Sequence, residues 1–344
     1  MKSEIRNVKL PVTEASQVAE ARRMATNLAR NIGFNETEIG KVAIVVSEAA
    51  RNLVKHAISG ELLLKSLNCE GIAGIEILAL DKGPGMTNIA ECLRDGYSTA
   101  GSMGTGLGAI VRLSALFDIH SIPRVGTALL VRLWSKPLPK NPTRYNLDIG
   151  AICLPKPGEE VSGDTYAVDQ RHDRSLILVV DGLGHGLLAA EAGMEAVRIF
   201  QNNINLGPAA IIEAAHFALR GTRGAAMAVS EVNRVQPPSV DKEKLSVRFS
   251  GIGNIAGVIL SSEESHSMVS HNGIVGHNVH RIQEFTYSLP VGGLLVMHSD
   301  GLQSRWNLER YPGIAGRHPN LIAGVLYRDF NRGRDDITVI VARA

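Results

Sequence analysis

The chain has 344 residues, of which 36 are basic and 34 acidic, giving a formal net charge of +2. A balance this close to neutral gives no electrostatic basis for binding nucleic acid or an anionic membrane. Hydrophobic residues make up 44% of the chain, enough to build packed cores. The three cysteines form no CxxC pair, so we expect neither a disulfide framework nor a thiolate metal site. No apolar run approaches bilayer-spanning length, which favours a soluble, cytoplasmic protein without a membrane partner.

A proline-rich segment divides the chain. Residues Ser135 to Arg144 hold three prolines, which suit neither a helix interior nor a central strand. The pieces on either side are of ordinary domain size. We therefore predict a first domain over residues 1–135, a linker over 136–147 and a second domain over 148–344.

Helices layered on one sheet, an α+β pattern, are predicted for the first domain. Apolar residues between Ala15 and Ile32 recur every three or four positions, as on the buried face of a helix, and Gly33 follows as a C-cap. Asn35 is expected to cap a second helix that runs through Leu53. The other elements expected here are a strand over Ile75–Asp81, a helix over Ala109–Phe117 and a strand over Ala128–Trp134.

Short β-rich runs dominate the second domain, and two helical stretches interrupt them. This pattern predicts a β-sandwich flanked by helices. The expected helices lie near Leu187–Asn203 and Pro208–Leu219. The expected strands are Leu176–Val180, Ser246–Ser250, Gly257–Leu260, Gly293–His298 and Ile337–Ala342.

Four polar residues share one face of the second predicted helix. Glu48, Asn52, Lys55 and His56 stand at i, i+4, i+7 and i+8, so their side chains project from the same side. Taken alone, the stripe is as consistent with a solvated, ion-paired surface as with a binding site.

Two glycine-rich segments follow the stripe. Asp81 ends a predicted strand, where its carboxylate can accept a hydrogen bond from an exocyclic amine such as that of adenine. Gly83 and Gly85 would let the backbone approach a ligand closely. The run Gly104-Thr105-Gly106-Leu107-Gly108 leads into a helix, whose N-terminal N–H groups can bind phosphate. Its spacing is not that of a dinucleotide fingerprint.

The ordered set of ExxxN on a helix, DxGxG after a strand and then GxGLG resembles the GHKL ATPase superfamily. Within it, residues 5–134 look like the anti-sigma-factor-type serine kinases of stressosome switches (RsbT-like). The resemblance implies a GHKL (Bergerat) α/β sandwich in which Asn52 holds Mg²⁺ and Glu48 is catalytic, orienting or deprotonating the attacking hydroxyl. The remaining contacts that it implies for ATP, phosphate or substrate are Lys55, His56, Asp81, Gly83, Gly85, Gly104, Gly106 and Gly108.

Aspartates recur at the edges of predicted strands in the second domain. They are Asp164, Asp181, Asp300 and the pair Asp335-Asp336. Any single Asp-Gly could be a hairpin turn. Four such positions together favour a site for hard divalent cations, which prefer carboxylate and carbonyl oxygens. Two such ions about 3.5–4 Å apart can clamp a phosphate and generate a hydroxide.

The order SGD, DGxGHG, SDG and DDIT resembles the PPM phosphatases, in particular the bacterial sporulation and stress branch (SpoIIE-, RsbU- and RsbX-like), over residues 148–344. It implies a PPM-type β-sandwich that hydrolyses phosphoserine or phosphothreonine with two Mn²⁺ or Mg²⁺ ions. His185 either acts on the leaving group or water, or is structural. No counterpart of the family's phosphate-binding arginine is found between residues 140 and 160. The implied metal ligands are Asp164, Asp181, the Gly182 carbonyl, Asp300 and either Asp335 or Asp336.

Together the resemblances imply a bifunctional switch protein of a bacterial partner-switching or stressosome-type pathway. The first domain would phosphorylate Ser or Thr of a STAS-domain anti-sigma antagonist or stressosome scaffold protein, and the second would remove that phosphate. In an alternative, only the phosphatase is active and the first domain is a nucleotide-sensing or partner-binding regulatory module. A third reading, an ATP-driven chaperone-like machine, is disfavoured because the sequence offers no transducer domain.

Overall fold

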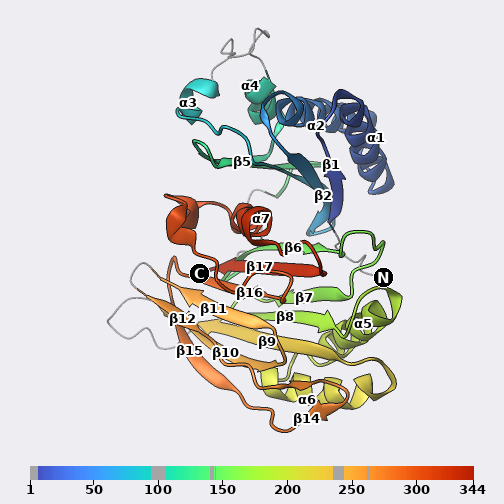
Figure 1. The fold of residues 1–344 in the computed structure, drawn as a ribbon, viewed down its shortest axis with the longest axis vertical. Coiled ribbons are helices and arrows are strands. Elements are labelled where there is room, and N and C mark those ends of the chain that lie inside the picture. The colour runs from blue at the N-terminus through green and yellow to red at the C-terminus, as the bar shows by residue number, and fades with distance from the viewer. Residues whose placement is uncertain (1–6, 94–105, 140–142, 144, 235–243, 262–263) are drawn as a thin grey trace. The chain divides into compact units, whose positions relative to one another are not determined.

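The computed structural model describes residues 7–93, 106–139, 143, 145–234, 244–261 and 264–344 (Figure 1). Its contacts divide the chain into two compact units. Unit 1 comprises Met1–Pro142 and Leu308–Arg328, and unit 2 comprises Thr143–Asn307 and Asp329–Ala344. This grouping differs from the expected linear division in the segment Leu308–Arg328. No helix in the described part of the chain is long and apolar enough to cross a membrane.

Unit 1 is built on a five-stranded sheet in the order β1-β2-β3-β5-β4, in which every neighbouring pair is antiparallel. The sequence prediction included β3 and β5 and missed the other three strands. The strands are β1 (Val8–Pro11), β2 (Gly60–Cys69), β3 (Ile72–Asp81), β4 (Leu116–Ile122) and β5 (Gly126–Trp134).

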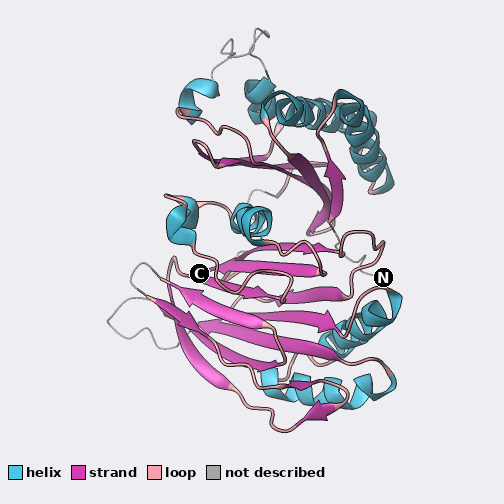
Figure 2. Ribbon diagram, viewed as in Figure 1, coloured by secondary structure: helices cyan, strands magenta, loops and turns pink. Residues whose placement is uncertain are grey.

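Two long helices, α1 (Ala15–Asn31) and α2 (Glu36–His56), pack with the sheet around one apolar core, as their periodicity predicts (Figure 2). The Asn35 side chain accepts a hydrogen bond from the Glu38 N–H at 2.9 Å, the expected N-cap. Two shorter helices, α3 (Ile89–Cys92) and α4 (Gly106–Leu113), complete this layer. The expectation of a helix to Phe117 is wrong, because residues from Leu116 onward pair with β5 as strand β4.

The segment Leu308–Arg328 adds the turns η2 (Leu308–Arg310) and η3 (Ile314–Gly316) and most of helix α7 (Pro319–Phe330) to unit 1. The buried Glu76 carboxylate of β3 accepts hydrogen bonds from Arg132 Nε at 2.7 Å and Asn320 Nδ2 at 2.6 Å. Burial alone would raise the pKa of Glu76, but the charges of Arg132 and Lys65 bring it below its usual range. A Cβ at Gly324 would lie 2.7 Å from Leu78 Cδ2, so glycine permits this close approach of α7 to β3.

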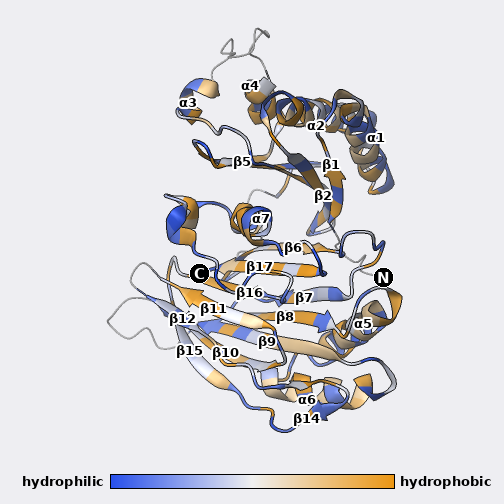
Figure 3. Cartoon of the chain, viewed as in Figure 1, coloured by the Kyte–Doolittle hydropathy of each residue, from blue (hydrophilic) through white to orange (hydrophobic). Residues whose placement is uncertain are grey.

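Unit 2 is a β-sandwich of two five-stranded sheets, ordered β15-β10-β9-β8-β7 and β12-β11-β16-β17-β6. A shared apolar core contains side chains from both sheets. Strand β8 is mostly hydrophobic along its length (Figure 3), as expected of a strand buried on both faces. The strands are β6 (Asp148–Leu154), β7 (Asp164–Gln170), β8 (Arg174–Gly182), β9 (Ala225–Arg234), β10 (Lys244–Ile252), β11 (Ala256–Leu260), β12 (Ser265–Ser267), β15 (Phe285–Pro290), β16 (Leu294–His298) and β17 (Ile337–Arg343).

Helices α5 (Leu187–Asn202) and α6 (Pro208–Ala218) share a second apolar core with β8 and β9. The 3-10 turn η1 (Leu219–Gly221) follows α6, and a small ribbon of β13 (Gly273–Ile274) and β14 (Asn278–Val279) lies beyond β12 in the chain. A helix-covered sheet in unit 1 and a helix-flanked sandwich in unit 2 confirm the predicted fold class.

Candidate functional sites

In unit 1, the start of α4 meets the polar stripe of α2. A Cβ placed on Gly106 would lie 2.9 Å from Glu48 Oε2 and 3.9 Å from Asn52 Oδ1. Glycine therefore lets the N-terminal N–H groups of α4 approach a carboxylate and an amide. The N–H groups can bind a phosphate group, and the carboxylate and amide oxygens can bind its cation. Gly104 lies outside the described residues.

The rest of the stripe lies near the end of α2. Lys55 and His56 are exposed there. Glu48 forms an ion pair with Arg51, one turn further along the same helix. This face of α2 thus presents the ion-paired carboxylate of Glu48, the amide of Asn52 and the exposed side chains of Lys55 and His56.

Asp81 organises the loop that follows β3. Its Oδ1 accepts hydrogen bonds from the Gly83 N–H at 2.7 Å and the Thr127 N–H at 3.2 Å. Burial raises the pKa of Asp81, and these two donors oppose the rise. A Cβ at Gly83 would lie 2.7 Å from the His56 carbonyl oxygen, so glycine lets this loop run against the end of α2. Gly85 has a φ of +67°, which also favours glycine.

In unit 2, strand pairing brings distant aspartates together. The antiparallel pairing of β7 with β8 sets Asp164 directly opposite Asp181. Asp300 follows β16 and Asp335 precedes β17, and these two strands are hydrogen-bonded neighbours. The Asn254 side-chain amide donates to Asp300 Oδ2 at 2.8 Å and lies 3.3 Å from Asp181 Oδ2. One amide therefore links carboxylates that are far apart in the sequence.

The electrostatics of this carboxylate group (Asp164, Asp181, Asp300, Asp335 and Asp336) favour a bound cation. Asp164 is 1% exposed, and its Oδ2 is buried without a hydrogen-bond partner among the described residues. Burial, then the neighbouring Asp181, raises the pKa of Asp164 well above its usual value. Burial and the charges of Asp300 and Asp335 raise the pKa of Asp181 to about 7. A divalent cation would relieve this crowding of like charges.

The oxygen donors suit Mg²⁺ or Mn²⁺ by their chemistry. Within the described ranges, no three His, Cys, Asp or Glu side chains are already arranged to hold a metal ion. Two observations indicate a cation site here: Asp164 Oδ2 is buried without a hydrogen-bond partner among the described residues, and the neighbouring carboxylates repel one another.

Asp335 and Asp336 have different surroundings. Both Asp336 carboxylate oxygens accept backbone hydrogen bonds, from the Lys156 N–H at 2.7 Å and the Gly163 N–H at 2.9 Å. Asp336 thus holds the backbone at Lys156 and at Gly163 beside the start of β17. Asp335 Oδ1 accepts the Asp336 N–H at 3.0 Å, and its charge acts on Asp181. This arrangement favours Asp335 as the ligand and a structural role for Asp336.

Gly182 ends β8, and His185 lies on the turn between β8 and α5. A Cβ at Gly182 would collide with the Ala189 carbonyl, so the turn that would present the Gly182 carbonyl needs glycine. His185 is exposed, and its Nδ1 lies 2.7 Å from Glu159 Oε1. The pair fixes the ring orientation, which suits either role expected for His185.

Sequence reasoning missed three residues near this site as functional candidates. Asn254 follows β10 and hydrogen-bonds two carboxylates. Its sequence signal is a polar residue directly after a glycine at the end of a strand. Arg223 lies beside the same turn, because its Nη1 would be 3.1 Å from a Cβ at Gly184. The Arg223 side chain is exposed. Glu159, the partner of His185, carries no distinctive sequence signal.

Known proteins similar to this chain match its two halves separately. Residues 10–133 match the histidine kinase-like ATPase domain family, and residues 171–344 match the Stage II sporulation protein E (SpoIIE) family. Over 117 residues the chain is 32% identical to serine/threonine-protein kinase RsbT of Bacillus subtilis (strain 168), covering 34% of this chain and 88% of that protein. Over 194 residues it is 24% identical to phosphoserine phosphatase RsbX of the same organism, covering 55% and 91%.

One similar solved structure is described as "The bacterial stressosome: a modular system that has been adapted to control secondary messenger signaling". The likeness has 30% sequence identity and a TM-score of 0.52, and it covers 58% of this chain and all of the other. These matches agree with the resemblances carried by the sequence motifs. The chain belongs to the SpoIIE family of PP2C-type serine/threonine phosphatases, and it carries a histidine kinase-like ATPase domain related to RsbT at its N-terminus.

Proposed function

We propose that this chain is a bifunctional switch enzyme. Unit 1 would transfer phosphate from ATP to a serine or threonine of a STAS-domain protein, and unit 2 would hydrolyse the resulting phosphoester. The observation that carries the proposal is that residue sets suited to these opposed reactions lie in separate units of one chain. The names of the relatives, a kinase, a phosphatase and a stressosome assembly, support a partner-switching context.

For the kinase reaction, unit 1 would act mainly by positioning. Phosphoryl transfer needs alignment of the two substrates and neutralisation of charge. Asn52 would hold the Mg²⁺ of Mg²⁺-ATP, the N–H groups at Gly106 would bind phosphate, and Asp81 would accept a hydrogen bond from adenine. Glu48 would orient the attacking hydroxyl once its carboxylate leaves Arg51.

For the hydrolysis, Asp164, Asp181, Asp300 and Asp335 would hold two divalent cations, with the Gly182 carbonyl as a further ligand. When bound, the cations supply a hydroxide nucleophile at neutral pH and polarise the phosphate. Arg223, beside the Gly184 turn, would contribute positive charge toward the substrate phosphate. His185, held by Glu159, would deliver a proton to the leaving serine oxygen.

One observation favours a second candidate function. The Glu48 carboxylate is engaged by Arg51, so the residue proposed to activate the hydroxyl is already paired. If that pair persists with nucleotide bound, unit 1 would bind ATP without transferring phosphate. It would then be a nucleotide-sensing or partner-binding module that regulates an active phosphatase.

A two-substrate assay tests the proposal. The purified chain is incubated with Mg²⁺, radiolabelled ATP and a STAS-domain protein, and separately with the phosphorylated STAS protein and Mn²⁺. Asn52→Ala should abolish labelling and spare phosphate release, and Asp181→Asn should do the reverse. Asn27→Ala, on the exposed face of α1, and Asp173→Asn, in the β7–β8 turn, are the matched controls.

The outcomes separate the two candidates. Phosphate release without labelling, together with ATP binding, would favour the regulatory module. A chain that neither labels nor dephosphorylates the STAS protein would refute both.

A further inference from the structure

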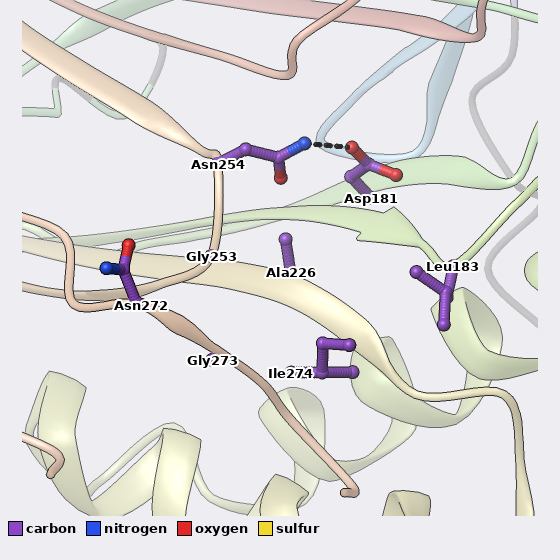
Figure 4. A pocket seen from close by; sticks show the side chains of 8 residues that line it. All are labelled: Asp181, Leu183, Ala226, Gly253, Asn254, Asn272, Gly273 and Ile274. Carbon is purple, nitrogen blue, oxygen red and sulfur yellow. Dashed lines mark hydrogen bonds between the residues drawn. The ribbon is translucent and has the colours of Figure 1, made fainter. Parts of the chain in front are cut away.

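A cleft of about 350 Å³ opens beside the carboxylate group of unit 2 (Figure 4). This volume is at the small end of the range for ligand sites. Four separate segments contribute its walls: the end of β8 with the turn that follows it, strand β9, the turn after β10 and the start of the β13–β14 ribbon. The lining residues are Asp181, Leu183, Ala226, Gly253, Asn254, Asn272, Gly273 and Ile274.

The lining combines amide groups with apolar surface. Asp181 is its one ionisable side chain, and that carboxylate belongs to the proposed metal site. The cleft therefore offers no cation of its own to a nucleotide or another anionic ligand. Amides can both donate and accept, which matches the alternating N–H and C=O groups of a polypeptide backbone.

The two asparagines that line the cleft differ in their hydrogen bonds. The Asn254 amide nitrogen is shared between Asp181 and Asp300. Asn272 is exposed, and among the described residues none hydrogen-bonds its side chain. Asn272 is thus the lining amide available to a ligand, while Leu183 and Ile274 offer apolar contact.

The backbone around the cleft is held in place. Gly253 has a φ of +91°, and a Cβ there would lie 2.5 Å from Ala226 Cβ. The Gly253 N–H donates to the His271 carbonyl at 2.8 Å, and the His271 N–H donates to the Gly251 carbonyl at the same distance. These bonds tie the segment that carries Asn272 to the end of β10, so the cleft is formed before any ligand binds.

We propose that this cleft binds the uncharged residues adjacent to the phosphorylated serine or threonine of a protein substrate. The inference rests on the proposed phosphatase function. Asp181 is common to the cleft and the carboxylate group, so a peptide in the cleft continues directly into a phosphate at the metal ligands. Asn272 hydrogen-bonds the peptide backbone, and Leu183 and Ile274 contact a small apolar side chain.

The test compares substrates with and without flanking residues. The probes are p-nitrophenyl phosphate, a phosphoserine peptide flanked by alanines and the same peptide flanked by glutamates, each with Mn²⁺. For the alanine peptide, Asn272→Ala should raise KM about threefold to tenfold, the effect of one lost hydrogen bond, and leave kcat unchanged. Its hydrolysis of p-nitrophenyl phosphate should equal that of the unsubstituted chain. The glutamate peptide should have the higher KM with the unsubstituted chain, because the cleft lining offers no cationic side chain to pair with its carboxylates.

Asn278→Ala, on the neighbouring strand β14, is the matched control and should leave the kinetics of all three probes unchanged. An unchanged KM for the alanine peptide in Asn272→Ala would overturn the cleft assignment while the phosphatase function stands. An equal loss on p-nitrophenyl phosphate would also overturn it, since it would indicate damage to the metal site. If the unsubstituted chain hydrolyses none of the three probes, the proposed phosphatase function itself fails.

Discussion

Replacing Asn254 with alanine would remove an amide that hydrogen-bonds two proposed metal ligands. The 2.8 Å bond to Asp300 Oδ2 is well formed, whereas the 3.3 Å contact with Asp181 Oδ2 is weaker. A hydrogen bond to a charged group contributes about 1.5–3 kcal/mol. Asn254 is exposed, so water can partly replace it, and the low end of that range applies. We expect Asn254→Ala to weaken Mn²⁺ binding about tenfold, in line with residues that orient metal ligands.

Calorimetric titration of the full chain with Mn²⁺ measures this effect without reference to activity. The nucleotide site is a second place for Mn²⁺, so the titration is run without ATP and repeated in Asn52→Ala. Asn272→Ala removes an amide of the same cleft that hydrogen-bonds no carboxylate among the described residues, and it should leave the affinity unchanged. Equal or tighter Mn²⁺ binding by Asn254→Ala would refute the reasoning, because it would mean that the amide competes with the metal instead of orienting its ligands.

Three further outcomes are expected. Gly253→Ala should lower the free energy of unfolding in urea by about 1–3 kcal/mol, because φ is +91° and the new Cβ would meet Ala226. Mn²⁺ at 100 times its Kd should add about 2.7 kcal/mol to the stability of unit 2, seen as a rise in Tm that Asp181→Asn removes and Asp173→Asn keeps. Glu76→Ala should cost about 3–5 kcal/mol in urea unfolding of unit 1, since Arg132 and Asn320 lose a buried carboxylate.

The fold was predictable from sequence where local chemistry agrees with tertiary packing. The helix α2 shows this, because its Asn35 cap and its apolar spacing both identify it. The sequence prediction included no helix at α7, whose segment Leu308–Arg328 makes its contacts with residues far earlier in the chain. The misplaced end of the helix near Phe117 has a similar cause. Pairing with β5 outweighs an apolar run that also suits a helix.

Sequence motifs predicted those residues of the candidate sites that lie within the motifs themselves. Glycines beside acids indicated both sites, because a close backbone approach leaves a sequence signal at positions such as Gly106 and Gly182. The loop residues that hydrogen-bond other members of the site have no such signal in the sequence. Glu159 reaches His185, and Lys156 reaches Asp336, through loop conformations that no periodicity encodes.

The two sites depend on the fold in different ways. In unit 1, Glu48 and Asn52 come from one helix, to which the fold adds the α4 contact at Gly106 and the loop that Asp81 holds after β3. In unit 2, Asp164 and Asp181 lie on one sheet of the sandwich, whereas Asp300 and Asp335 adjoin strands of the other. The pair Asp164 and Asp181 approaches the pair Asp300 and Asp335 only when the two sheets pack on their shared core, where Asp336 accepts a hydrogen bond from the Gly163 N–H. Apolar packing between the sheets must therefore supply the free energy that holds these like charges together until a cation binds, which couples the metal affinity of unit 2 to the integrity of its core.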